Sequence, residues 1–270
     1  MKTPPDAFPS RLEHFDSVDS TQRIVRQWLD SGTPEVAVAV AAHQSAGRGR
    51  QGRGWTAPPG AALLLSAGFR PSSLTTRHAW RLAATLSLAM LDAAEDAAGL
   101  KDDTLWLKWP NDIVADAPAG RLVKVAGVLG ETAGVGEGVE SGVIGIGVNT
   151  DWPAELFPLA LAPSMSSLRE LSGGRPIDNE QLLDAFLARL EPRYEALRAG
   201  IFDAGGWSRR QRTTGRQVDV DLGERRLAGL ASGVDPESGA LIVEAAGEEL
   251  RIESGEVVGC RIVEGLPRLV

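Results

Sequence analysis

The stretch LVKVAGVLGETAGVGEGVESGVIGIGVNT, residues 122–150, decides the fold because it contains two long apolar runs in succession. LVKVAGVLGE and SGVIGIGVNT each have the length and composition of a strand. Gly134, Gly136 and Gly138 lie between the two runs and favour a hairpin-like link. We therefore expect two neighbouring strands of one sheet here.

Other elements follow from the same kind of pattern. Strands are predicted where short apolar runs end at turn residues, at 36–42, 62–69 and 104–109. Helices are predicted where apolar residues recur every three or four positions, at 17–31, 77–98, 166–171 and 179–200. Pro192 lies inside the last of these helices, where a proline is expected to kink or split it.

The C-terminal part of the chain has a different sequence pattern. From about Thr213, short strands alternate with turns such as DPESG at the spacing of roughly eight to twelve residues that is typical of small barrels. We therefore predict two domains, 1–212 and 213–270.

Composition limits the class of protein. The formal net charge is −8 over 270 residues, which argues against a broad cationic surface for nucleic acid but allows a local site for a small anion. Cys260 is the one cysteine, so an intramolecular disulfide is excluded. The three histidines are far apart, and the sequence shows no Cys/His metal-ligand spacing. Neither a signal peptide nor a membrane-spanning run is evident, so we predict a soluble cytoplasmic protein that does not enter membranes.

The segment HQSAGRGRQGRGW, residues 43–55, concentrates arginine and glycine in this acidic chain. Gly47, Gly49 and Gly52 match G-x-G-x-x-G, but the prolines that follow Trp55 exclude the helix that a dinucleotide site requires. A P-loop is also excluded, because its lysine and hydroxyl residue are missing. A plain solvated loop is one alternative. The other is an anion site, since glycines expose backbone N–H groups and arginine forks bind carboxylate or phosphate.

Two further motifs carry lysine in a chain that has few lysines. KWPND (108–112) is either a plain turn after a strand or a site where Asp112 binds magnesium or positions an amine. In KVAGVLGE (124–131), Lys124 either reaches solvent from an edge strand or faces an anion, and Gly127 lets a ligand approach the backbone.

Two polar segments are ambiguous when taken alone. Asn149, at the end of GIGVNT, suits a turn or an amide contact to a base. In DST (19–21), Asp19 with Gln22 three residues later is a signature of helix capping, which is the interpretation favoured by the sequence. The alternative directs the hydroxyls of Ser20 and Thr21 toward a neutral polar ligand.

Taken in order, DST, Gln44 with GRGRQGRGW, KWPND, KVAGVLGE and GIGVNT resemble the biotin protein ligase family, in its form without an N-terminal DNA-binding domain. The resemblance implies an α+β fold: a catalytic domain whose mixed β-sheet is flanked by helices, similar to class II synthetases, plus a small SH3-like β-barrel. It also implies ATP-dependent activation of biotin as biotinyl-5′-AMP with release of pyrophosphate. Biotin is then transferred to a lysine of a biotin carboxyl carrier domain of acetyl- or acyl-CoA carboxylase.

The resemblance implies a role for each matching residue. Contacts to biotin are expected from Ser20, Thr21, Gln44, Arg48, Arg50, Gly127 and Lys124. Contacts to ATP or the adenylate are expected from Arg50, Arg53, Trp55, Lys124 and Asn149. The residues implied in catalysis are Lys124, Arg48 and Asp112, with Asp112 also the implied magnesium ligand. The arginine–glycine loop is expected to act as a lid that protects the adenylate from water.

Some features depart from the family pattern. Because DST begins at residue 19, we expect no DNA-binding domain before it and no DNA binding. Gln22 stands where the family usually has asparagine. The resemblance is compatible with a monomer or a homodimer. Two rival functions remain: a lipoate or octanoate ligase or transferase of the same broad fold, and a non-catalytic module that senses biotin or nucleotide.

Overall fold

A seven-stranded mixed sheet forms the centre of the computed structural model, which describes residues 8–262. Its strand order is β1-β2-β3-β7-β6-β5-β4. The strands are β1 (Arg11–Phe15), β2 (Ala37–Ala41), β3 (Ala62–Phe69), β4 (Leu105–Lys108), β5 (Asp112–Ala117), β6 (Arg121–Val135) and β7 (Gly138–Asn149). β1 and β2 are parallel, and the other neighbours are antiparallel.

The β6–β7 hairpin confirms the expectation drawn from residues 122–150. Val135 pairs with Gly138 across a turn in which Gly136 has a φ of +61°, a conformation that favours glycine. β7 also pairs with β3, so the hairpin lies inside the sheet rather than at its edge. Long apolar runs suit such a position, because both faces of an interior strand are covered.

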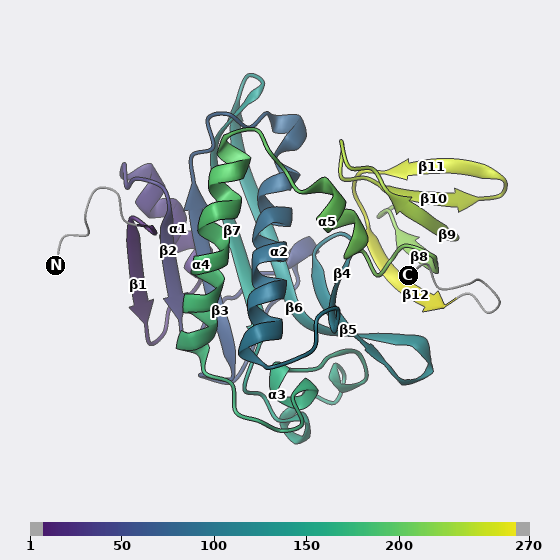
Figure 1. Ribbon diagram of the computed structural model, residues 1–270, viewed down its shortest axis with the longest axis horizontal. Coiled ribbons are helices and arrows are strands. Elements are labelled where there is room, and N and C mark those ends of the chain that lie inside the picture. Colours follow the sequence, from purple (N-terminus) through teal and green to yellow (C-terminus); the bar gives the residue numbers. More distant parts are fainter. Residues whose placement is uncertain (1–7, 263–270) are drawn as a thin grey trace.

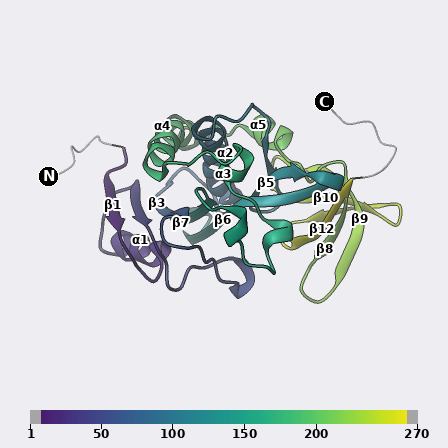
Figure 2. The same ribbon diagram turned by 90° about the horizontal axis from the view of Figure 1, so that it is seen from below.

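Helices cover both faces of the sheet (Figures 1 and 2). The helix α1 (Thr21–Asp30) packs on one face, against β2, β3 and β7. On the other face lie α2 (Trp80–Ala97) and α4 (Asn179–Arg198), packed side by side. The short helices α3 (Leu168–Leu171) and α5 (Ala204–Arg209) follow the strand β7 and α4 respectively.

The main hydrophobic core lies between the sheet and the α2–α4 pair. Phe186 of α4 and Leu86 of α2 are completely buried there. Phe69 of β3 packs on Tyr194 of α4 with ring centroids 4.8 Å apart. Pro192 lies within α4, which continues through it as one helix, so the expected splitting of this helix is wrong.

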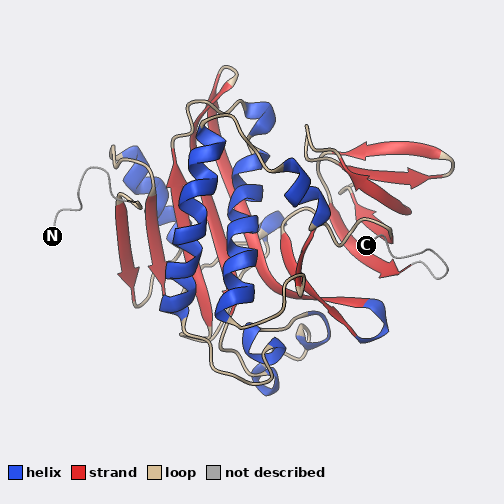
Figure 3. Cartoon of the chain, in the orientation of Figure 1, coloured by secondary structure: helices blue, strands red, loops and turns tan. Residues whose placement is uncertain are grey.

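A second sheet, entirely antiparallel, forms the C-terminal part of the described chain (Figure 3). Its order is β11-β10-β9-β8-β12, with strands β8 (Arg216–Asp221), β9 (Arg226–Val234), β10 (Leu241–Ala245), β11 (Glu248–Ile252) and β12 (Glu256–Ile262). This sheet is compatible with a small β domain. Its closure as an SH3-like barrel and the division at residues 212/213 stay predictions.

The two sheets are joined through the end of β4. The backbone N–H of Leu107 donates to the carbonyl of Arg210 at 2.8 Å, and that of Arg212 donates to the carbonyl of Leu107 at 2.7 Å. Trp109 follows directly, and its indole Nε1 donates to the carbonyl of Gly239 at 3.0 Å. The KWPND turn is therefore held between the central sheet and the second sheet.

Four elements were not identified in the sequence: β1, β5, α5 and the last strand, β12. β1 alternates half-buried and exposed residues at the sheet edge, so its apolar signal is weak. β5 begins at Asp112, inside the motif that was interpreted as a turn. The helix α5 has the sequence AGGWSR, which contains two poor helix formers. Among the described helices, none is both long and apolar enough to span a membrane.

Truncation of a core side chain tests this packing. Phe186→Ala should lower the free energy of unfolding by about 3–5 kcal/mol, because it removes a completely buried ring between α2 and the sheet. Leu159→Ala is the control, since Leu159 is 94% exposed. Urea titrations of the three proteins check the expectation, and equal midpoints for both variants would contradict it.

Candidate active site

Glycines on β6 and β7 form a flat floor on the α1 face of the sheet. Gly127 and Gly147 are paired in register. The indole of Trp55 lies directly over both: a Cβ added at Gly147 would be 2.5 Å from its Cε2, and one added at Gly127 would be 3.0 Å from its Cζ3. A Cβ at Gly145 would in turn meet the side chain of Gln22 at 3.0 Å. Glycine is required at these positions because any side chain would displace the groups above.

Polar groups at the start of α1 meet beside this floor. The N–H and Oγ1 of Thr21 donate to Oε1 of Gln44 at 2.8 and 3.1 Å. Oγ1 of Thr21 also lies 2.7 Å from Oγ of Ser66, and both side chains are buried. The structure thus brings Thr21 and Gln44 together, and Ser20 lies next to them at the helix start.

The capping interpretation of DST is wrong in its details. The N-cap of α1 is Ser20, whose side chain makes no capping hydrogen bond within the described chain. Asp19 instead accepts from the backbone N–H of Ser20 at 2.7 Å and forms an ion pair with Arg23. The amide of Gln22 donates to the carbonyl of Leu129 at 3.0 Å. Asp19 is thus used in other local contacts and Gln22 in a tertiary one, and both compete with capping.

A cavity of about 260 Å³ opens at this end of α1. It is lined by Asp19, Ser20, Gln22, Arg23, Arg26, Ala46 and Arg48. A residue from the DST motif and an arginine of the glycine–arginine loop therefore face one space. Its volume is close to the lower end of small-molecule sites, which are roughly 300–1,000 Å³.

The loop from Gly47 to Trp55 folds back on itself. The N–H of Gly49 donates to the carbonyl of Arg53 at 2.7 Å, and the N–H of Trp55 donates to the carbonyl of Gly47 at 3.0 Å. A Cβ at Gly47 would collide with the carbonyl oxygen of Trp55. The segment between Trp55 and β3, described throughout, contains no helix. The exclusion of a dinucleotide fingerprint is therefore confirmed.

Each arginine of this loop lies near a carboxylate. Nη1 of Arg48 is 3.2 Å from Oε1 of Glu131, and Nη1 of Arg53 is 2.6 Å from Oε1 of Glu256. Burial lowers the pKa of Arg50, while the charges of Glu256 and Asp112 act against that shift. Charges of opposite sign beside a half-buried cation favour its charged form.

Lys124 and Asp112 form the central ion pair of the site. Nζ of Lys124 lies 2.6 Å from Oδ1 of Asp112, and Nζ of Lys108 lies 3.8 Å from Oδ2. Lys124 Nζ is also 5.3 Å from the centroid of the Trp55 ring. Because β6 is an interior strand, the edge-strand alternative for Lys124 is wrong.

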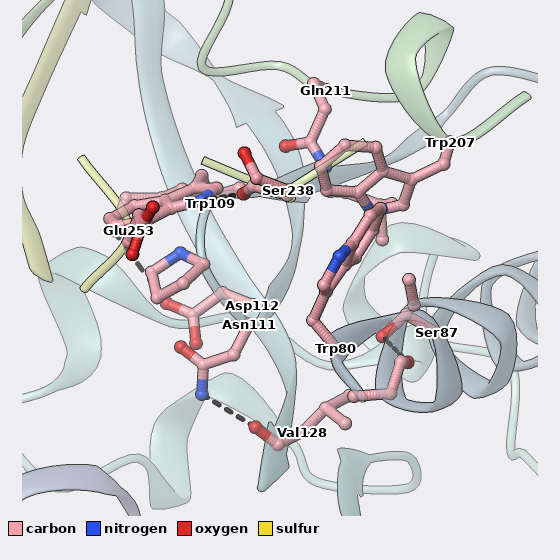
Figure 4. A pocket seen from close by; sticks show the side chains of 16 residues that line it. Trp80, Ser87, Trp109, Asn111, Asp112, Val128, Trp207, Gln211, Ser238 and Glu253 are labelled. Atoms are coloured by element: carbon pink, nitrogen blue, oxygen red, sulfur yellow. Dashed lines mark hydrogen bonds and ion pairs between the residues drawn. The ribbon is translucent and has the colours of Figure 1, made fainter. Parts of the chain in front are cut away.

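The KWPND turn separates this site from a second cavity of about 150 Å³ (Figure 4). Trp109 is buried, and Nδ2 of Asn111 donates to the carbonyl of Val128 at 2.7 Å. The cavity lies between α2, this turn and the second sheet, with Trp80, Trp109 and Trp207 in its wall. Lys108 donates to the carbonyl of Val257 at 2.7 Å, so the turn is fixed from both sides.

Asn149 is connected to the strand of Lys124 through Ser166, whose N–H donates to the carbonyl of Lys124 at 2.8 Å. It is buried at the end of β7, and its Nδ2 donates to the carbonyl of Ser166 at 2.9 Å. In this arrangement its amide N–H₂ fixes the segment before α3, and its role toward adenine stays a prediction.

The described residues contain no metal cage. Within 8–262, no three His, Cys, Asp or Glu side chains gather closely enough to hold an ion. The oxygens of Asp112 face the ammonium groups of Lys124 and Lys108. Asp112 could thus be only a single carboxylate ligand to magnesium held by a nucleotide, a mode that magnesium commonly uses.

Sequence reasoning missed several residues of the site. Two of these signals are visible in the sequence. Ser66 is the one hydroxyl residue in ALLLSAGF, and glycines stand at alternate positions in GIGV. Glu131 and Glu256 have no local signal, because each becomes relevant only when the fold brings it to an arginine of the loop.

Comparison with known proteins agrees with this site. Residues 14–149 match the biotin/lipoate A/B protein ligase family. The chain is 34% identical over 227 residues to the biotin–[acetyl-CoA-carboxylase] ligase of Mycobacterium tuberculosis, covering 83% of this chain and 79% of that protein. Identity to the corresponding ligase of Paracoccus denitrificans is 31% over 239 residues, or 85% and 92% of the two chains. The structure also resembles the biotin protein ligase from Aquifex aeolicus in complex with biotin and ATP, with a TM-score of 0.76 and 25% identity over 94% of this chain and 99% of that one.

The chain therefore belongs to the biotin/lipoate A/B protein ligase family, and it is a ligase. Within that family it groups with the biotin protein ligases, which confirms the resemblance drawn from its motifs.

The glycine floor can be tested by adding one methyl group. Gly147→Ala should displace Trp55 and loosen the loop, so that trypsin cuts faster at Arg48, Arg50 and Arg53. Gly233→Ala is the control, since a Cβ there meets nothing within 4 Å. In a Trp55→Ala background, Gly147→Ala should add little to the cutting rate, because the clashing ring is gone. Unchanged cutting of the single variant would contradict the close contact.

Proposed function

We propose that this chain is an ATP-dependent biotin protein ligase that modifies a lysine of a biotin carboxyl carrier domain. The observation that carries the proposal is the Lys124–Asp112 pair, set between the glycine floor and a loop with three arginines. Biotin carboxylate and ATP are both anions, so the site must supply positive charge where they meet. The names of the relatives from M. tuberculosis and P. denitrificans support acetyl-CoA carboxylase as the source of the carrier.

In the first step, a carboxylate oxygen of biotin attacks the α-phosphorus of ATP and pyrophosphate leaves. Negative charge grows on the phosphoryl oxygens in the transition state. Lys124, 2.6 Å from Asp112 in the ligand-free structure, is the proposed donor to the α-phosphate and the acyl oxygen. Fixed cations of this kind stabilise the developing charge without reorganisation.

In the second step, the ε-amino group of the carrier lysine attacks the acyl carbonyl carbon, and AMP leaves with the electrons of the C–O bond. The attacking nitrogen loses a proton as the amide forms. The carboxylate of Asp112 is the proposed group that orients this amine. Its oxygens already lie 2.6 Å from Nζ of Lys124 and 3.8 Å from Nζ of Lys108, so the carboxylate is placed to accept hydrogen bonds from an amino group.

The remaining assignments divide between the two substrates. For biotin, we propose the ureido ring near Ser20, Thr21 and Gln44, with Gly127 under the bicyclic ring and Arg48 near the carboxylate. The hydrogen bonds between Thr21 and Gln44 support this grouping. For ATP, we propose Arg50, Arg53, Trp55 and Asn149. Arg50 serves both substrates where carboxylate and phosphate meet.

Several broader proposals accompany this function. Magnesium would arrive with ATP and shield its phosphates, with Asp112 as the candidate protein ligand. We propose a cytoplasmic enzyme that does not bind DNA, and the net charge of −8 supports the second of these two points. We propose a catalytic domain over residues 1–212 and a small β domain over 213–270. The enzyme is proposed to act as a monomer or homodimer.

The decisive experiment mixes the protein with biotin, ATP and magnesium, with and without an apo carrier domain. Pyrophosphate release and a carrier mass gain of one biotinyl group on lysine are expected, with no gain when lipoate replaces biotin. Modification by lipoate alone would favour the lipoate branch of the family. Absence of pyrophosphate in every mixture would sink the ligase proposal.

Lys124 should dominate the first step. Lys124→Ala should slow adenylate formation by roughly two to three powers of ten, the loss seen when a transition-state donor is removed from an oxyanion site. Lys101→Ala is the matched control, because Lys101 is exposed and outside the site. Biotin-dependent exchange of labelled pyrophosphate into ATP measures both. Near-wild-type exchange by Lys124→Ala would remove it from this role.

A further inference from the structure

The glycine–arginine loop makes one contact that the proposed mechanism leaves unexplained. Nη1 of Arg53 lies 2.6 Å from Oε1 of Glu256, the first residue of β12. This ion pair connects the loop of the central sheet with the second sheet. Lys108 of the KWPND turn reaches the next residue, since its Nζ donates to the carbonyl of Val257 at 2.7 Å. Consecutive residues of β12 thus contact two separate motifs of the site.

The backbone around Glu256 is fixed. Glu256 pairs in register with Asp221 of β8. A Cβ at the preceding Gly255 would lie 3.0 Å from Cδ2 of Leu222 and 3.1 Å from the carbonyl oxygen of Asp221. The chain therefore approaches its neighbours closely just before this residue. The Glu256 carboxylate is consequently presented to the loop by a residue that is paired within the second sheet.

The carboxylate acts on two arginines at once. It is paired with Arg53, and its charge also favours the charged form of Arg50, which is half-buried. The Glu256 side chain is only 21% exposed, so solvent screens it less than a free surface charge. Both arginines are the residues we assign to ATP, and phosphate oxygens accept the same bidentate hydrogen bonds as a carboxylate.

We propose that Glu256 competes with the phosphates of ATP for Arg53: it pairs with the guanidinium before ATP binds and is displaced when ATP arrives. Only the second part of this inference, the displacement of Glu256 by ATP, rests on the proposed function. Before ATP binds, Glu256 keeps the arginine fork near the place where phosphate arrives. Once phosphate occupies that place, two anions would share one guanidinium, and their repulsion opens the Glu256–Arg53 pair. The second sheet would thereby influence how tightly the enzyme binds ATP.

The ligand-free half is tested without substrates, by limited trypsin digestion and mass spectrometry. Trypsin cleaves after an arginine only when that side chain is free to enter the specificity pocket of trypsin. Glu256→Gln should therefore speed cleavage after Arg53 several-fold, while cleavage after Arg48, which pairs with Glu131, should change little. Glu249→Gln is the matched control, because Glu249 is an exposed carboxylate on β11 of the same sheet. Equal cleavage after Arg53 in wild type and Glu256→Gln would overturn the proposal.

The ligand-bound half is tested by pyrophosphate exchange at varied ATP and saturating biotin. Glu256→Gln should lower the KM for ATP by about two- to fivefold, the size expected for loss of one partly exposed charge pair. The KM for biotin should not move. Arg53→Gln should raise the KM for ATP. In the Arg53→Gln background, Glu256→Gln should change the KM for ATP by less than half as much as it does in the wild type. Glu256→Asp, which keeps the charge, should lie close to wild type.

The outcomes separate the two proposals. A higher KM for ATP in Glu256→Gln would overturn displacement by phosphate. So would a Glu256→Gln effect on the KM for ATP that is equal in the wild type and in the Arg53→Gln background. An equal change in the KM for ATP and for biotin would indicate a merely structural role and would also overturn it. If the wild type shows no biotin-dependent exchange at all, the ligase function fails, and the trypsin result still decides whether Glu256 holds Arg53.

Discussion

The register of β6 against β7 is the constraint on which the site depends. Because Gly127 is paired with Gly147, two residues without side chains lie next to each other on the α1 face. The flat surface that results admits the ring of Trp55, and it places Lys124 and Asp112 at its border. A register slip of one residue would exchange Gly147 for Ile146 or Val148 on this face, since side chains alternate along a strand. The same alternation sends those apolar residues into the core beneath α2.

The cationic side chains of the site lie against carboxylates, so this acidic protein does not build the site from an excess of positive charge. The arginines of the loop face Glu131 and Glu256, and Lys124 faces Asp112. Pairing of this type holds the arginine side chains in defined places, and under our proposal a phosphate has to displace the carboxylate from Arg53. The carboxylates also keep a concentrated cationic loop from attracting unrelated anions. A net charge of −8 is therefore compatible with a site for two anionic substrates.

The sequence was informative where the signal is local. The strand ALLLSAGF is β3 from end to end, and the glycine-rich link after β6 is a hairpin turn. The motifs also identified Thr21, Gln44, Lys124 and Asp112 as site residues. In the fold, Thr21 contacts Gln44 and Lys124 contacts Asp112. What could not be predicted depends on partners distant in the chain. At DST, Asp19 pairs locally with Arg23, but Gln22 is held by the distant carbonyl of Leu129, and Glu256 is identified only by its place opposite Arg53.

The position of Trp55 bears directly on where biotin can bind. Its indole covers Gly127, where we place the bicyclic ring of biotin, so both cannot occupy the floor together. The Nε1 of the indole is buried and has no hydrogen-bond partner in the described chain. An unsatisfied buried donor costs about 1–3 kcal/mol, and the Lys124 ammonium, 5.3 Å from the ring centroid, acts against that cost. Biotin would replace the indole with a ring that has its own hydrogen bonds to make, and the loop would carry Trp55 toward the adenylate side. The glycines that admit the indole are the same ones that we propose to admit biotin.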